Sequence, residues 1–160
     1  MDQKDLEKLL SELKILPKET EWVEFKIDYY HSQEIGEYIS ALSNSACLHN
    51  KVKGYLVFGI ENETHNVIVT HFKPKQEKVS NEELESWLAR LLNPRIDFVI
   101  YEFQYSGKQI VLFEIDATDN TPVRFNGVTY IRVGSYKKKL SDYPEKERKI
   151  WKRQIEYDWS

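Results

Sequence analysis

An acidic segment with an apolar centre, Glu19–Lys26, restricts the fold of this chain more than any other stretch. Its Trp-Val-Glu-Phe-Lys run predicts a β-strand, on which successive side chains point to opposite faces. Glu24 and Lys26 then share one face, while Val23 and Phe25 share the other and can enter a core. A rise of roughly 3.3 Å per residue sets Glu24 and Lys26 about 7 Å apart at Cα. Both side chains can therefore reach one metal ion, phosphate or water.

The same pattern has a simpler explanation. An acid and a lysine on an exposed strand face ordinarily form a solvated cross-strand pair. Arg132, which lies on a later predicted strand, can in turn point inward and pair with an acid such as Glu24. The residues alone leave open whether Glu24 and Lys26 form a functional site or a structural pair.

Size and composition indicate one globular domain spanning residues 1–160. Hydrophobic residues make up 41% of the chain and aromatic residues 13%, which is enough for a substantial core. No apolar run approaches the roughly 20 residues that cross a bilayer, and the charged N-terminus does not resemble a signal peptide. The single cysteine, Cys47, excludes an internal disulfide and fits a reducing compartment. We therefore expect a cytoplasmic protein without a membrane partner.

Hydrophobic periodicity predicts alternating helices and strands. Ser80-Asn-Glu-Glu83 has the sequence of a capping box and predicts a helix that begins at Ser80 and ends before Asn93-Pro94. Asn126-Gly127 predicts a tight hairpin turn. The other expected helices are at 3–15, 34–46 and 144–157, and the expected strands are at 22–27, 54–60, 67–69, 96–103, 109–115, 123–125 and 129–133. This order predicts an α+β fold with a mixed, mostly antiparallel sheet and flanking helices.

Charge is distributed unevenly along the chain. The net charge is −3, whereas a dedicated non-specific nucleic-acid binder is usually basic. Residues 124–153 nevertheless contain ten Lys or Arg and three acids. Tyrosines interleave with cations in this region, and such a surface can grip phosphates and stack on unpaired bases. We expect Arg132, Lys137, Lys138 and Lys139 to contact nucleic acid, although a solvated lysine-rich loop is the simpler alternative.

Several segments in order resemble the Schlafen-type AlbA-like domain. They are Glu24-Phe-Lys26, Ala41-Leu-Ser-Asn-Ser45, Gly54-Tyr-Leu-Val-Phe-Gly-Ile-Glu61 and Asn126-Gly-Val-Thr-Tyr-Ile-Arg-Val-Gly-Ser135. The resemblance covers about residues 19–140, with the helices at 3–15 and 144–157 appended to it. It implies a nucleic-acid-binding module of α+β fold.

The resemblance also implies a possible active site. Schlafen proteins cleave structured RNA with three carboxylates, and the matching positions here are Glu19, Glu24 and Glu61. Carboxylates of this kind bind Mg²⁺ or Mn²⁺, which neutralises the scissile phosphate and activates water. Lys26 would then hold a phosphate oxygen or the attacking water.

One segment departs from the family pattern. Where relatives have a glycine pair, this chain has a longer and more basic connection from Asn44 to Gly54, which includes Lys51 and Lys53. These two lysines are further candidates for nucleic-acid contacts.

Three functions remain open, in order of preference. The first is a nucleic-acid-binding domain, the second a metal-dependent endoribonuclease acting on structured RNA such as tRNA, and the third a protein-interaction or oligomerisation domain. Because Schlafen cores pair two similar lobes and this chain holds one, we also expect a homodimer. The sequence contains no Walker loop, dinucleotide fingerprint or nucleophile elbow.

Overall fold

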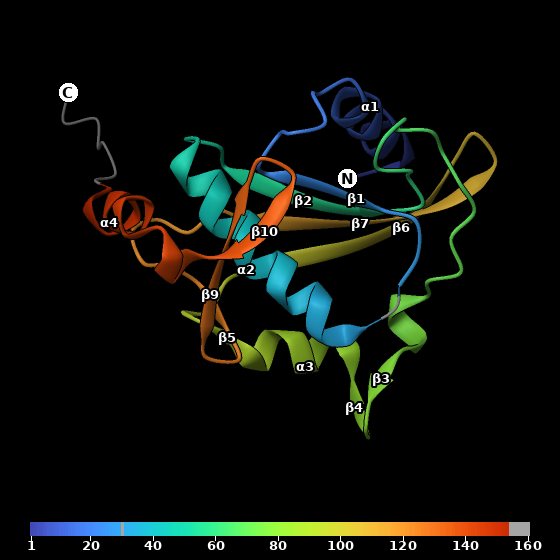
Figure 1. Ribbon diagram of the computed structural model, residues 1–160. Helices are drawn as coiled ribbons and strands as arrows, with labels where there is room; N and C mark the ends of the chain where they lie inside the picture. The colour runs from blue at the N-terminus through green and yellow to red at the C-terminus, as the bar shows by residue number, and fades with distance from the viewer. Residues whose placement is uncertain (30, 154–160) are drawn as a thin grey trace, which may run out of the picture.

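Two four-stranded sheets form the centre of the protein in the computed structural model, which describes residues 1–29 and 31–153 (Figure 1). The first sheet has the strand order β1-β2-β7-β6 and the second the order β10-β9-β8-β5. β3 and β4 form a separate two-stranded hairpin. The combination of helices with mixed, mostly antiparallel sheets confirms the predicted α+β class.

The helices and strands have the following bounds. The helices are α1 (Gln3–Lys14), α2 (Ser32–Leu48), α3 (Leu84–Leu91) and α4 (Pro144–Lys152), with two 3₁₀ turns, η1 (Pro74–Gln76) and η2 (Leu140–Asp142). The strands are β1 (Val23–Lys26), β2 (Lys53–Phe58), β3 (Lys78–Val79), β4 (Glu82–Glu83), β5 (Leu92–Asn93), β6 (Phe98–Tyr105), β7 (Lys108–Asp116), β8 (Arg124–Phe125), β9 (Val128–Val133) and β10 (Tyr136–Lys139). The predicted helix 144–157 is described as far as Lys152, and its last residues, from 154, lie outside the described residues.

The early acidic strand lies beside the glycine-flanked strand. β1 pairs with β2 in parallel, with Glu24 opposite Leu56, and all other neighbours in this sheet are antiparallel. Parallel neighbours need a long crossover connection, and α2 provides it. The acidic strand and the glycine-flanked strand are therefore direct neighbours in the first sheet.

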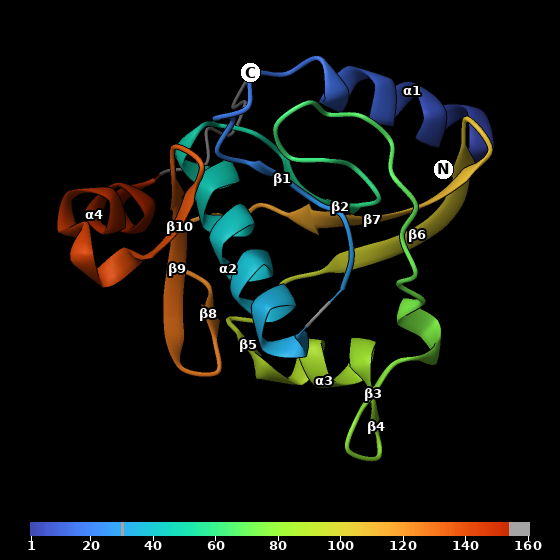
Figure 2. The same cartoon turned by 45° about the vertical axis from the view of Figure 1, so that its right-hand side comes forward.

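Helices cover both faces of the first sheet (Figure 2). On one face, Leu42 of α2 and Leu88 of α3 pack with Leu56 and Phe113. On the other face, α1 buries its leucines against Phe25 and neighbouring apolar side chains. β1 therefore has one apolar face toward α1, while Glu24 points to the side of α2.

The polar residues of α2 attach the second sheet to the rest of the protein. Asn44 is fully buried and its side chain accepts a hydrogen bond from the Val123 amide at 2.8 Å, while donating to the carbonyls of Val123 and Tyr130. The Ser40 hydroxyl donates to the same Val123 carbonyl, and the Ser45 hydroxyl accepts from the Arg132 amide. The Ala-Leu-Ser-Asn-Ser run thus satisfies backbone groups that sheet pairing leaves free.

One local prediction is wrong and another is confirmed. Ser80 does not cap a helix, because it occupies the β3–β4 turn with a φ of 55°, and α3 begins four residues later at Leu84. The pairing of β3 with β4 takes Glu83 into a strand. Asn126-Gly127 forms the expected hairpin turn between β8 and β9, with both residues at positive φ.

Helix length also bears on membrane association. α2 is the longest of the described helices, at 17 residues. Over residues 1–29 and 31–153, no helix has the length and apolar character needed to cross a bilayer.

Candidate nucleic-acid interface

A buried ion pair joins the two sheets. The Glu24 side chain on β1 and the Arg132 side chain on β9 are 7% and 1% exposed, and Oε2 of the acid lies 2.6 Å from Nη1 of the arginine. The same Nη1 donates to the Val23 carbonyl, while Nε and Nη2 donate to the Gly134 carbonyl. Arg132 therefore cannot reach a phosphate in solution, which corrects its assignment as a nucleic-acid contact. The alternative, an inward arginine paired with Glu24, is what the structure contains.

The charge state of Glu24 reflects this burial. Desolvation raises the pKa of Glu24, and the positive charges of Arg132 and Lys26 oppose that rise. A buried carboxylate that has a cation partner and hydrogen bonds is a stable arrangement, but removing either partner leaves an uncompensated charge. Glu24 is therefore a structural partner of Arg132 rather than a free metal ligand.

Next to this pair, two ammonium groups lie close to the Tyr38 ring of α2. The Nζ atoms of Lys26 and Lys137 are 4.9 Å and 4.6 Å from the ring centroid. Lys26 pairs with Glu34 at 3.1 Å, and Lys137 pairs with Glu37. Each of these two lysines thus has a carboxylate partner from α2, so a phosphate would have to displace an internal ion pair to bind either.

Ionisation in this cluster follows the pairing. Burial lowers the pKa of Lys26, but the nearby Tyr38, Glu34 and Glu24 outweigh burial and leave the pKa raised. Burial raises the pKa of Glu37, but its hydrogen bonds to Lys137 and other neighbours outweigh burial and leave that pKa below its ordinary value. Lys26 and Glu37 are therefore both charged near neutral pH.

The three acids implied by the family resemblance do not meet. Glu19 is exposed in the loop before β1, and Glu24 is turned toward Arg132. The Glu61 carboxylate instead closes its own loop, accepting hydrogen bonds from the amides of Glu63 at 2.9 Å and Thr64 at 2.6 Å. These hydrogen bonds hold the pKa of Glu61 below its usual range.

The predicted metal site is therefore not assembled as a group of three acids. Over the described parts of the chain, no three His, Cys, Asp or Glu side chains are grouped so that they could hold a metal ion. Two of the three carboxylates already have partners: the buried Arg132 guanidinium binds Glu24, and backbone amides of the loop after β2 bind Glu61.

The two lysines of the basic connection differ in their surroundings. Lys53 forms an ion pair with Asp116 at the start of β2, and this hydrogen bond raises the pKa of Lys53. Lys51 is exposed, and its Nζ lies 4.9 Å from the centroid of the Trp22 ring. Lys51 is thus available to an anion, whereas Lys53 is largely neutralised by its partner.

The β9–β10 hairpin carries two further lysines and an aromatic ring that are accessible to solvent. Lys138 and Lys139 are exposed, and Tyr136 is 68% exposed. Nζ of Lys138 lies 5.6 Å from the Tyr136 ring centroid. Neither lysine, nor Lys51, forms an ion pair with any residue among 1–29 and 31–153. We call Tyr136, Lys138 and Lys139 the ribbon.

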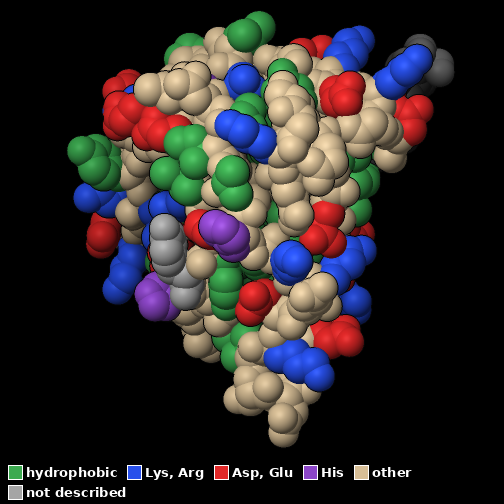
Figure 3. All heavy atoms as spheres, turned by 90° about the vertical axis from the view of Figure 1, so that its right-hand side faces the viewer, with side chains coloured by type: hydrophobic (Ala, Val, Ile, Leu, Met, Phe, Trp, Pro, Cys, Tyr) green, Lys and Arg blue, Asp and Glu red, His purple; other side chains and the backbone are tan. Residues whose placement is uncertain are grey.

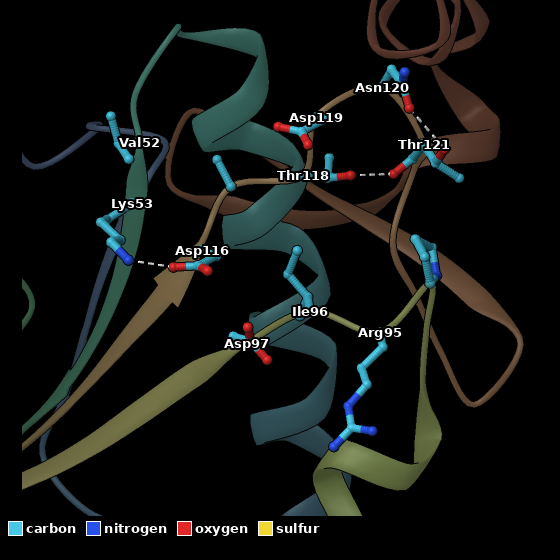
Figure 4. A pocket seen from close by; sticks show the side chains of 12 residues that line it. Val52, Lys53, Arg95, Ile96, Asp97, Asp116, Thr118, Asp119, Asn120 and Thr121 are labelled. Carbon is cyan, nitrogen blue, oxygen red and sulfur yellow. Dashed lines mark hydrogen bonds and ion pairs between the residues drawn. The ribbon is translucent and has the colours of Figure 1, made fainter.

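Sequence reasoning did not identify one polar groove of about 510 Å³ at the end of the first sheet (Figure 4). Asp97, Asp116 and Asp119 line it, together with Arg95 and Lys53. Its three carboxylates oppose phosphate binding, because like charges at short range repel. The Asp-Ala-Thr-Asp run after an apolar strand is the only signal in the sequence that points to this groove.

The face of the molecule at the right of Figure 1 carries charges of both signs. Figure 3 shows the face at the right of Figure 1, where Lys and Arg side chains alternate with Asp and Glu around exposed apolar groups. No continuous field of one sign covers that face. In Figure 1, α4 lies at the left and β10 lies nearer the centre of the molecule.

Comparisons with known proteins agree with this architecture. A family profile described as Schlafen, AlbA_2 matches residues 19–141. The DIP2311 protein from Corynebacterium diphtheriae is similar in structure, with a TM-score of 0.53 and 16% identity over 91% of this chain, which spans 32% of that longer chain. The N-terminal domain of a DNA helicase RecG-related protein from Nitrosomonas europaea has a TM-score of 0.50 and 21% identity, covering 81% of this chain and 89% of that one.

A comparison with curated proteins gives no significant match. At these identities, the two solved structures establish a common fold and nothing about activity. The profile, in contrast, covers more than half of the sequence, from the loop before β1 to the turn after β10. The chain therefore belongs to the Schlafen AlbA_2 family.

Proposed function

We propose that this protein binds nucleic acid through the ribbon, with Lys51 as an additional contact. The observation that carries the proposal is the difference between neighbouring lysines. Lys137 is held by Glu37, whereas Lys138 and Lys139 are exposed next to the Tyr136 ring. Exposed cations without acid partners bind phosphates at little electrostatic penalty, and an exposed ring can stack on a base.

Family membership and the name of one protein of similar fold are in keeping with this proposal. The chain belongs to the Schlafen AlbA_2 family, and one protein of similar fold is named as related to a DNA helicase. Overall charge is not an obstacle, because the −3 net charge is an average over faces of different character. Nucleic-acid affinity depends on the local positive potential and on the release of counterions from the phosphates that are contacted.

The test is binding of labelled single-stranded DNA, duplex DNA and tRNA, measured by fluorescence anisotropy at several salt concentrations. Replacing Lys138→Ala and Lys139→Ala together should weaken binding and reduce the dependence of log K on log salt by about 1.4 to 1.8, for two lost phosphate contacts. A matched control removes Lys73 and Lys75, two exposed lysines at the 3₁₀ turn η1 that precedes β3. Equal effects of the two double variants would contradict the proposal.

The nuclease alternative requires a different arrangement of acids from the one described. Glu24 is bound to Arg132 and Glu61 to its own loop, so no observation favours cleavage over binding. Parallel incubations of tRNA with Mg²⁺, with Mn²⁺ and with chelator provide the check. Cleavage that depends on metal and is lost in Glu19→Gln would revive this alternative.

Self-association remains a prediction. Light scattering after size-exclusion chromatography measures the mass directly, and twice the 19.1 kDa chain mass is the expected value for a homodimer. If no nucleic acid binds at modest salt and the protein is a stable oligomer, the interaction-domain alternative becomes the better description.

A further inference from the structure

The C-terminal helix α4 is fixed in place by its apolar side. Ile150 is fully buried and packs with Ile131, Leu140 and Cys47. At the end of the helix, Nη1 of Arg153 donates to the Cys47 carbonyl at 2.8 Å, which ties α4 to the last turn of α2. The side of α4 opposite Ile150 therefore has a fixed outward orientation.

That outward side is basic. Arg148, Lys149 and Lys152 are exposed, and the one exposed acid on the helix is Glu145. Arg148 and Lys152 lie one turn apart, a spacing at which like charges repel and destabilise a helix. Within the described ranges 1–29 and 31–153, none of these three cations forms an ion pair. A bound polyanion would relieve this repulsion.

A tryptophan lies among these cations. Trp151 is 53% exposed and follows Arg148 by three residues, so the two side chains are neighbours on the helix surface. An exposed indole ring offers a flat π-surface, and every base can stack on such a surface when it is not already paired. The pattern of a ring flanked by cations is that of a site for unpaired bases with their phosphates.

We infer that α4 binds single-stranded nucleic acid, with Trp151 stacking on a base and Arg148 and Lys152 contacting phosphates. This inference rests on the proposed function and extends it from the ribbon to a helix outside the family-matched residues 19–141. The 3₁₀ turn η2 connects β10 directly to α4, and Figure 1 shows the two next to each other. A strand crossing the ribbon can therefore continue onto the helix.

A membrane surface is the main competing partner for a basic helix, and the structure argues against it. Amphipathic helices bind lipid by burying an apolar face between headgroups. The apolar side of α4 is already occupied by the protein core through Ile150, which leaves Trp151 as its single exposed large apolar side chain. One ring provides little apolar area for insertion.

The experiment compares a labelled oligothymidine strand of about 20 nucleotides with a hairpin duplex of similar length. Trp151→Ala should weaken binding of the single strand about 5- to 140-fold, leave its salt dependence unchanged, and barely affect the duplex. Trp151→Phe should restore most of the affinity. Arg148→Ala with Lys152→Ala should weaken binding and lower the salt slope for the single strand by about 1.4.

Lys4→Ala with Lys8→Ala is the matched control, because it removes two exposed cations one turn apart on α1. This control should bind as the unmodified protein does. If Trp151→Ala and the α4 double variant bind like the control while the ribbon variant is weakened, this inference is refuted and the proposed function stands. If the unmodified protein binds no nucleic acid, both fail. Stronger binding to anionic vesicles than to the oligonucleotide would also overturn the inference.

Discussion

Replacing Glu24 with alanine should destabilise this protein more than any other single loss of a carboxylate. Arg132 is 1% exposed, so without its partner it retains only backbone carbonyl contacts in a region shielded from water. Breaking one side of a buried ion pair typically costs about 3–5 kcal/mol, because the remaining charge is not compensated. Glu24→Gln keeps a hydrogen-bond acceptor but not the charge, so we expect a smaller loss of about 1–3 kcal/mol.

Urea unfolding followed by far-ultraviolet circular dichroism measures these differences, provided that the slope with denaturant is unchanged. The double variant Glu24→Leu with Arg132→Met is the decisive companion, since replacing both charges by apolar groups of similar size is often nearly neutral. It should be more stable than either single variant. Two results would refute this account of the buried ion pair. One is a double variant whose loss of unfolding free energy equals the sum of the two single losses, and the other is a loss below about 1 kcal/mol in Glu24→Ala.

Three further predictions follow from single contacts. Glu37→Gln should make the free energy of unfolding depend less steeply on pH below about pH 4.5. The pKa of Glu37 is lowered in the folded protein, so its stabilising contribution, on the order of 1 kcal/mol, is lost as pH falls. Urea midpoints at a series of pH values test this. Asn44→Ala should lower the free energy of unfolding by about 3 kcal/mol and speed amide hydrogen exchange at Val123, whose N–H loses its acceptor. An unchanged exchange rate at Val123 would contradict the hydrogen bond from its N–H to Asn44. Gly36→Ala should cost about 1–3 kcal/mol, since an added Cβ would lie 2.1 Å from the Phe125 ring; a thermal melt that matches the unmodified protein would contradict this.

Local rules predicted much of the fold. The leucine spacing of α1, the alternation of β1 and the Asn126-Gly127 turn each depend on residues a few positions apart, and the structure contains all three. The capping box at Ser80 failed because Glu83 pairs with Lys78 in the β3–β4 hairpin, and this pairing competes with a helix start at the same residues. The order of segments then indicated the family. The parallel pairing of β1 with β2 came from the structure alone.

The candidate site depended on contacts that no local pattern encodes. Lys137 and Lys138 are neighbours in the sequence, yet opposite strand faces send one to Glu37 and leave the other in solvent. Glu24 was proposed both as a metal ligand and as a partner of Arg132, and only the packing of the second sheet against β1 selected the arginine. The sequence therefore determined which residues carry charge and where the longer strands β2, β6, β7 and β9 lie. The tertiary structure decided which charges are neutralised, because ion pairing depends on distances of a few ångströms between residues as many as 108 positions apart.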